Sequence, residues 1–223
     1  MPRADEIRAN VADVEARIAA ACARAGRKRS DVRLVAVTKT FPASDVEHAI
    51  AAGMSDVGEN KVQEARDKQP EVHGAARWHL IGHLQSNKAK DAVRLFDVIQ
   101  TVDSFELAEK LARHAEAARK TQDVLLQVNI GRETQKSGAE IDDVPALARR
   151  MAGLQSIRLR GLMAIPPAGE PEAMRAFFRE LRAMRDDLGL DELSMGMTDD
   201  FEVAIEEGAT IVRVGRAIFG SRG

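Results

Sequence analysis

The sequence has 223 residues, of which 44% are hydrophobic and 30% charged, as is typical of a globular protein with a substantial core. The formal net charge of −2 provides no positive field that would recruit nucleic acid or an anionic membrane, so neither partner is expected. A single cysteine excludes an intrachain disulfide and a thiolate zinc site, and without a signal-peptide pattern or a bilayer-length apolar segment we expect a cytoplasmic protein.

The N-terminal segment has the spacing of one face of an amphipathic helix. Its apolar positions are Ile7, Val11, Val14, Ile18 and Cys22, and Gly26 follows where a helix would end. Strand and helix patterns then alternate along the chain. The predicted strands are residues 32–38, 54–58, 78–82, 97–102, 124–130, 158–164, 192–196 and 210–214. The predicted helices are residues 42–52, 60–69, 84–94, 104–119, 142–152, 171–188 and 199–207.

Some of the predicted helices carry an explicit start signal. Asp103 with Glu106, and Asp199 with Glu202, have the spacing of a capping box. Pro171 suits the first turn of the helix that it opens. We therefore expect helices to begin close to these residues.

The alternation of eight strands with helices predicts an α/β fold. Eight strands after one extra N-terminal helix is the count for a single (β/α)₈ barrel of the TIM type, and no linker divides residues 1–223 into smaller domains. An open doubly wound sheet is the alternative. That fold would be favoured by a glycine-rich turn after the first strand, and residues 38–42 contain no glycine.

Lys39 follows the first predicted strand, where α/β barrels place their reactive groups. A partly desolvated lysine has a lowered pKa, so its neutral amine can attack an aldehyde and form a Schiff base. The alternative is an ordinary strand-end lysine whose amine reaches solvent. The other predicted strand ends bear on this choice, because in a barrel they converge with Lys39 on one mouth.

Two of those strand ends have the character of a phosphate site. Residues 194–198 supply hydroxyl groups around Gly196, and Gly215 and Arg216 follow the eighth strand. Barrels of this type often bind phosphate with the loops after strands seven and eight. A lysine opposite such a site indicates a ligand with an aldehyde at one end and a phosphate at the other. Pyridoxal 5′-phosphate fits that description.

The chain resembles the pyridoxal-phosphate homeostasis proteins, a family related to the barrel of alanine racemase. The matching motifs are VAVTKT (35–40), GENKVQE (58–64), WHLIGHLQSNK (78–88), QKSG (135–138), GLMAIP (161–166), SMGMTDD (194–200) and VRVG (212–215). They occur in order over nearly the whole chain. This ordered set is far more specific than any single motif.

The resemblance implies that Lys39 holds the cofactor as an aldimine, that Asn60 lies beside the cofactor, and that Arg213 faces its pyridine nitrogen. It also implies that Ser194 and the backbone of residues 196–198 and 215–216 hold the phosphate. Our full set of expected cofactor-binding residues is Lys39, Asn60, Met163, Ser194, Gly196, Met197, Thr198, Arg213, Gly215 and Arg216. The family usually has a small hydroxyl residue where this chain has Arg216. The Arg216 side chain could therefore contact the phosphate itself or leave that contact to its backbone N–H.

Several residues favour a carrier over an enzyme. A guanidinium such as that of Arg213 cannot accept a proton from the pyridine nitrogen, which weakens the cofactor as an electron sink. Alanine racemase, by the resemblance, adds a tyrosine from another domain and subunit, and this chain contains no tyrosine. We therefore expect a monomer without catalytic residues that delivers pyridoxal phosphate to apo-enzymes. A weak racemase or lyase, or an aldolase-like enzyme that binds no phosphate, remains the alternative.

Other polar residues are expected to lie outside the cofactor site. His79 and His83 are four residues apart but straddle a strand end and a glycine, so we predict no metal site. Lys136 follows the fifth predicted strand and could approach the barrel mouth, but we expect it to be a solvated loop lysine.

Overall fold

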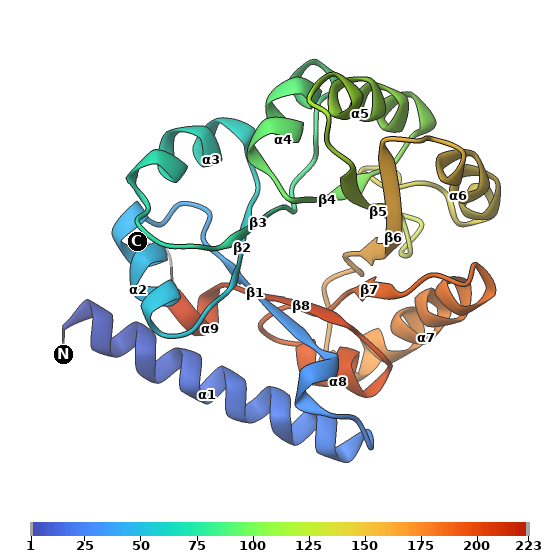
Figure 1. Cartoon of the computed structure of the whole chain (residues 1–223). Coiled ribbons are helices and arrows are strands. Elements are labelled where there is room, and N and C mark those ends of the chain that lie inside the picture. Colours follow the sequence, from blue (N-terminus) through green and yellow to red (C-terminus); the bar gives the residue numbers. More distant parts are fainter. Residues whose placement is uncertain (1, 222–223) are drawn as a thin grey trace.

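The computed structural model describes residues 2–221 and contains a closed parallel barrel. The eight strands lie side by side in chain order, and the first strand also pairs with the last, with Val35 opposite Arg213. This closure confirms the predicted (β/α)₈ barrel and rejects the open sheet (Figure 1). The strands are β1 (Arg33–Val37), β2 (Asp56–Glu59), β3 (Arg77–Leu80), β4 (Val98–Val102), β5 (Gln122–Val128), β6 (Ile157–Ala164), β7 (Glu192–Ser194) and β8 (Ile211–Val214).

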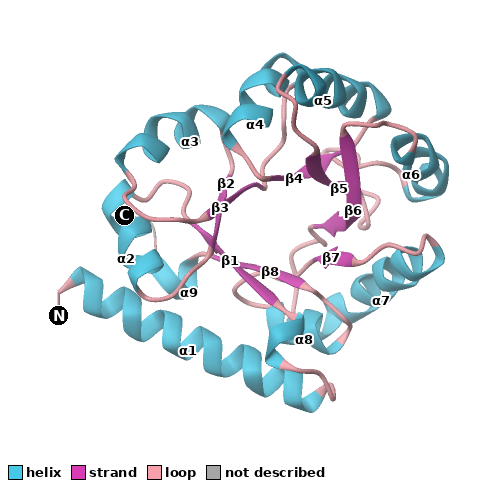
Figure 2. Ribbon diagram, in the orientation of Figure 1, coloured by secondary structure: helices cyan, strands magenta, loops and turns pink. Residues whose placement is uncertain are grey.

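The α-helices form an outer layer around the strands (Figure 2). They are α1 (Arg3–Arg24), α2 (Ala43–Ala51), α3 (Val62–Lys68), α4 (Ala89–Leu95), α5 (Phe105–Ala117), α6 (Val144–Ala152), α7 (Pro171–Asp187), α8 (Phe201–Glu206) and α9 (Arg216–Phe219). Short 3₁₀ turns occur at Arg29–Asp31, Gln69–Glu71, Ser86–Lys88 and Ile141–Asp143. No helix in the described part of the chain combines the length and the apolar character needed to cross a membrane.

The apolar core has two parts. The larger part lies outside the strands, because the surrounding helices bury apolar stripes there, and α1 buries its own stripe against other helices. The smaller part consists of Val35, Leu125, Met163 and Ile211, which come from four different strands and contact one another. Buried polar side chains from other strands therefore have to account for much of the remaining barrel interior, and they include the residues of the functional site.

The extra N-terminal helix, α1, lies across α2, α8 and α9, beside the strands that close the barrel (Figure 1). The predicted apolar face is buried, with Ile7 at one end and Cys22 at the other. Polar contacts fix its position: Arg3 pairs with Asp45 of α2 at 2.6 Å, and Asn10 donates to the carbonyl of Ile218 at 2.9 Å. The helix thus joins the beginning of the described chain to its end.

Some predicted helix boundaries were wrong by a few residues. Helix α5 begins after Ser104, whose Oγ accepts a hydrogen bond from the amide of Leu107 at 3.3 Å, so Ser104 and not Asp103 caps the helix. Helix α8 begins after Asp200 instead of at Asp199. Helix α4 begins only at Ala89, because residues 86–88 form a 3₁₀ turn.

Candidate functional site

A cavity of about 260 Å³ opens at the carboxyl mouth of the barrel, where the strands end. Residues that follow or end β1, β2, β3, β6, β7 and β8 line it, so segments far apart in sequence meet here. The lining residues are Val37, Lys39, Asn60, Ile81, Ile165, Met197, Thr198, Asp199, Arg213, Gly215 and Arg216. Its position matches the place where barrels of this fold carry their functional groups.

Lys39 lies in the turn between β1 and α2 and is half-buried at the cavity. Both neighbours of Lys39 are anchored by other side chains. The Thr38 hydroxyl donates to Glu59 Oε1 at 2.6 Å, and the Thr40 amide donates to the carboxylate of Glu64. Thr40 has a φ of +70°, a left-handed conformation that non-glycine residues adopt only when the surroundings enforce it. The turn that carries Lys39 is therefore held in one defined shape.

A buried ion pair supports this turn from below. The Lys68 ammonium contacts Glu59 Oε1 at 2.5 Å and donates to the carbonyl of Thr38 at 2.8 Å. Burial raises the pKa of Glu59, and the ammonium and the Thr38 hydroxyl offset this effect only in part. Glu59 Oε2 is buried and has no hydrogen-bond partner among the described residues. The carboxyl group therefore depends strongly on Lys68.

Asn60 directly follows β2 and reaches the cavity beside Lys39. Its backbone is covered by the turn after β3, where a Cβ on Gly82 would lie 2.3 Å from the Asn60 carbonyl oxygen. Only glycine permits this approach. The glycine of the motif at residues 78–88 is thus needed to hold Asn60 in place.

Arg213 lines the cavity although the residue is only 3% exposed, and its guanidinium is buried. It donates to Ser194 Oγ at 2.5 Å and to the carbonyl of Ala164 at 2.9 Å. Burial lowers the pKa of Arg213 to about 10, although the charge of the Asp200 carboxylate raises it. The guanidinium remains charged at neutral pH and is fixed in orientation by the two acceptors.

The structure brings most of the predicted cofactor-binding residues together, but not all of them. Lys39, Asn60, Met197, Thr198, Arg213, Gly215 and Arg216 line the cavity. Ser194 does not, because its hydroxyl is fully buried between Arg213 and Gln100. Gly196 is buried against α8, with φ +90° and Phe201 close by, and Met163 belongs to the inner core. A position at a strand end was thus not sufficient to place a side chain in the cavity.

The rim of the cavity carries an ion pair that the sequence did not indicate. Arg216 contacts the carboxylate of Asp199, and the two side chains are 59% and 71% exposed. Pairs this exposed contribute little to stability, so the two loops can separate at small cost. Met197 lies beside them and is 37% exposed.

Lys136 lines a neighbouring cavity, which shares Ile165, Met197 and Asp199 with the first. Its ammonium donates to the carbonyl of Pro166 at 3.2 Å and pairs with Glu133. It is therefore nearer to the site than a solvated loop lysine would be. Among residues 2–221, no three His, Cys, Asp or Glu side chains are grouped as a metal site requires.

Comparison with known proteins gives consistent matches over the whole chain. The sequence model of the family described as "Alanine racemase, N-terminal domain" matches residues 5–223. A pyridoxal phosphate homeostasis protein from Pseudomonas aeruginosa is 48% identical over 217 residues, covering 96% of this chain and 94% of that protein. One from Escherichia coli K12 is 42% identical over 229 residues, covering 98% and 97%. The structure of PipY from Synechococcus elongatus with PLP bound has a TM-score of 0.84 at 38% identity, covering 96% of this chain and 100% of that one.

Proposed function

This chain belongs to the pyridoxal phosphate homeostasis protein family, and on that premise we propose that it binds pyridoxal 5′-phosphate reversibly and supplies it to apo-enzymes. The observation that carries the proposal is the convergence of Lys39, Arg213 and Gly215 on one cavity. The related PipY structure, solved with PLP bound, supports the choice of ligand.

The groups around the cavity fit the chemistry of this cofactor. Val37, Ile81 and Ile165 provide apolar walls for an aromatic ring. Lys39 would hold the cofactor through its amine, and the cofactor would supply an aldehyde that forms a reversible linkage with a lysine. The Arg213 guanidinium would donate a hydrogen bond to the pyridine nitrogen.

The phosphate would bind between the loops after β7 and β8. Thr198 has no hydrogen-bond partner among the described residues, so its polar groups are available to a ligand at the cavity. A Cβ on Gly215 would lie 3.2 Å from Val37 Cβ, so glycine allows this loop to pass close to β1. Because Ser194 is engaged elsewhere, the site rests on Thr198 and on the backbone of residues 215–216.

The same residues support a carrier rather than a catalyst. Pyridoxal phosphate acts as a strong electron sink when its ring nitrogen is protonated, and a carboxylate partner favours that state. Arg213 has only donors, and its charge disfavours a protonated ring nitrogen. The exposed Arg216–Asp199 pair closes the rim only weakly, which suits capture and release.

The proposal is tested by loading the protein and recording its absorbance spectrum. Wild type should show the band of a lysine-bound cofactor, and borohydride reduction with peptide mapping should place the label on Lys39. Lys39→Ala should lose the band, whereas Lys136→Ala serves as the control and should retain it. A label on Lys136 would disprove the assignment.

A weak racemase or lyase is the second candidate, because the matching family model is that of the alanine racemase N-terminal domain. Incubation of the loaded protein with single amino acids separates the two functions. A carrier should leave the amino acids unchanged. Turnover on the order of 1–10³ s⁻¹ would instead identify an enzyme.

A further inference from the structure

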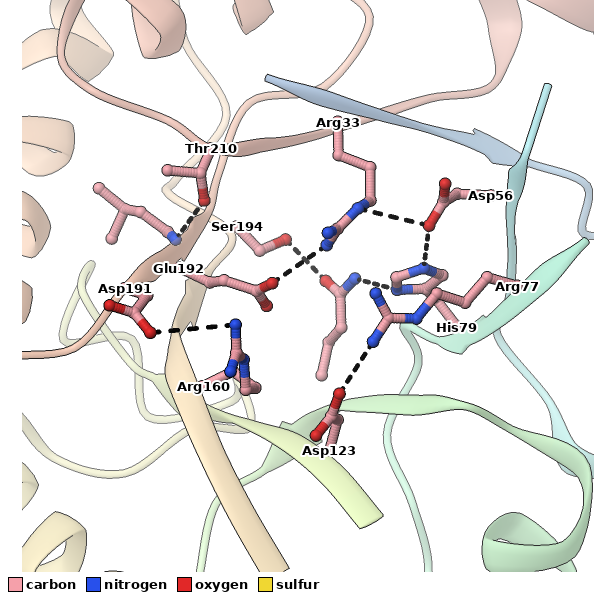
Figure 3. A network of polar contacts seen from close by, with 12 residues as sticks. Arg33, Asp56, Arg77, His79, Asp123, Arg160, Asp191, Glu192, Ser194 and Thr210 are labelled. Carbon is pink, nitrogen blue, oxygen red and sulfur yellow. Dashed lines mark hydrogen bonds and ion pairs between the residues drawn. The ribbon is translucent and has the colours of Figure 1, made fainter. Parts of the chain in front are cut away.

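A network of hydrogen-bonded, buried polar side chains, called the polar network below, crosses the barrel interior from Arg213 at the cavity toward the amino ends of the strands. Figure 3 shows the part of it that runs from Ser194 to Asp56. Arg213 contacts Ser194 at 2.5 Å, Ser194 contacts Gln100 at 2.6 Å, Gln100 contacts His79 at 2.9 Å, and His79 contacts Asp56 at 2.8 Å. Ser194, Gln100 and His79 are fully buried, and Asp56 is 5% exposed. In order from Arg213 to Asp56, the residues of the polar network come from β8, β7, β4, β3 and β2.

Arg213 and Asp56, at the two ends of the polar network, determine the direction of every hydrogen bond in it. Arg213 can only donate, so the Ser194 oxygen accepts and its single hydrogen points to Gln100 Oε1. An ionised Asp56 can only accept, so His79 donates from Nε2 and must accept at Nδ1 from the Gln100 amide. The assignments made from opposite ends meet at Gln100 without conflict.

The charged groups around the polar network favour an ionised Asp56 and a neutral His79, as these hydrogen-bond directions require. Burial raises the pKa of Asp56, but hydrogen bonds from His79 and Ser55 and the charge of Arg33 together bring it below its usual value. Burial lowers the pKa of His79 despite Asp56, and Arg77 and Arg33 act in the same direction. The ion pair of Arg33 with Glu192, at 3.1 Å, continues the contacts to the amino face of the barrel (Figure 3).

Protonation of His79 would break this arrangement. Both ring nitrogens would then donate, so Gln100 would have to turn its oxygen toward Nδ1 and its amide toward Ser194. The Ser194 oxygen would receive donors from both Gln100 and Arg213, and its own hydrogen would lose its acceptor. A buried unsatisfied donor is costly, so a neutral His79 keeps Arg213 in its observed orientation.

We propose that His79 and Gln100 are positioning residues, which act through Ser194 to fix the Arg213 guanidinium at the cavity and thereby set the environment of the bound cofactor. This inference rests on the proposed function, because Arg213 is taken to face the cofactor ring. It gives Ser194 a role other than phosphate binding. It also links the cavity to Asp56, at the opposite end of β2.

The first test needs no cofactor. Nitrogen-15 NMR of the histidine side chains should show His79 as the neutral Nε2–H tautomer between pH 6 and 8, with the signal assigned by its loss in His79→Gln. The opposite tautomer, or an imidazolium, in this range would contradict the proposal. In Gln100→Glu the carboxylate cannot donate to Nδ1, so His79 should become an imidazolium at a pH at which wild type is neutral.

The second test uses the loaded protein. Gln100→Leu should shift the absorbance band or its pH midpoint and weaken pyridoxal phosphate binding about tenfold, as supporting groups behind a ligand typically do. The control is Gln122→Leu, which removes a fully buried glutamine that is not part of the polar network. It should lower thermal stability but leave the band unchanged.

The outcomes separate the two proposals. If wild type binds through Lys39 but Gln100→Leu behaves like Gln122→Leu, the positioning role is wrong and the proposed function stands. If wild type forms no lysine-bound cofactor, the proposed function fails whatever the tautomer of His79. Partial recovery of the wild-type band in His79→Gln relative to His79→Leu would support the proposal, because an amide can both donate and accept.

Discussion

Replacement of Lys68 by methionine tests how the turn that carries Lys39 is held. The change keeps an apolar stem of similar length but removes the ammonium that contacts Glu59 at 2.5 Å and the carbonyl of Thr38 at 2.8 Å. The Glu59 side chain is fully buried and that of Lys68 is 7% exposed, so solvent screens the pair little. Removing one partner of such a pair leaves an uncompensated charge, and we expect a loss of about 3–5 kcal/mol in the free energy of unfolding.

The pH dependence gives this prediction a definite sign. Burial already raises the pKa of Glu59, and without Lys68 the pKa should rise further. A carboxyl group whose pKa is higher in the folded state loses its contribution to stability as the pH rises through that value. The deficit of Lys68→Met should therefore be largest at alkaline pH and shrink as the pH falls and Glu59 takes up a proton.

Urea unfolding at pH 8 and pH 5 measures both effects. Lys110→Met is the matched control, because Lys110 pairs at 2.9 Å with Glu106, whose side chain is 76% exposed. This control should stay close to wild type at either pH. Adding Glu59→Gln to Lys68→Met should restore part of the lost stability by removing the charge. A deficit below about 1 kcal/mol at pH 8, or one independent of pH, would refute the reasoning.

Three further changes probe the loops and a helix cap. Gly196→Ala should lower the free energy of unfolding by more than Gly189→Ala. Both glycines have a positive φ, but a Cβ on Gly196 would lie 2.6 Å from Ala204, whereas a Cβ on Gly189 would meet no atom within 4 Å. Equal losses in urea unfolding would contradict this. Ser104→Ala should cost about 0.5–2 kcal/mol in the same assay, since it removes the cap of α5. Arg216→Thr should change the Kd for pyridoxal phosphate less than about fivefold, because the guanidinium contacts Asp199 in a weak, exposed pair and the proposed phosphate site rests on Thr198 and the backbone of residues 215–216. A larger loss would place the guanidinium on the phosphate.

The fold could be predicted because its signals are local. Strands β1 and β8 are short runs rich in aliphatic residues, and Pro171 opens α7 as its position indicated. The start of α5 was missed by one residue because Asp103 and Ser104 are both good caps, and only their backbone conformation decides between them. The late start of α4 was missed because a 3₁₀ turn and a helix share the same apolar spacing over a few residues.

The candidate site was predictable only to the level of strand ends. Lys39 and Arg213 reach the cavity because the ends of parallel strands meet there. The hydrogen bonds of the Ser194 hydroxyl to Gln100 and Arg213 could not be predicted, because these partners lie on other strands and leave no local pattern in the sequence. Whether a strand-end hydroxyl faces a ligand or is engaged by its neighbours depends on such distant contacts.

The position of α1 affects how the protein folds during its synthesis. The helix is made before α8 and α9, yet Arg3 bonds to a carbonyl 216 residues later and Arg17 bonds to Glu202, 185 residues later. Helix α2 follows early in the chain, but the part of the apolar stripe that packs against α8 and α9 has no partner until they have left the ribosome, and surface exposed during synthesis invites aggregation. This part of the stripe is therefore a surface that we expect chaperones to cover while the chain is being made.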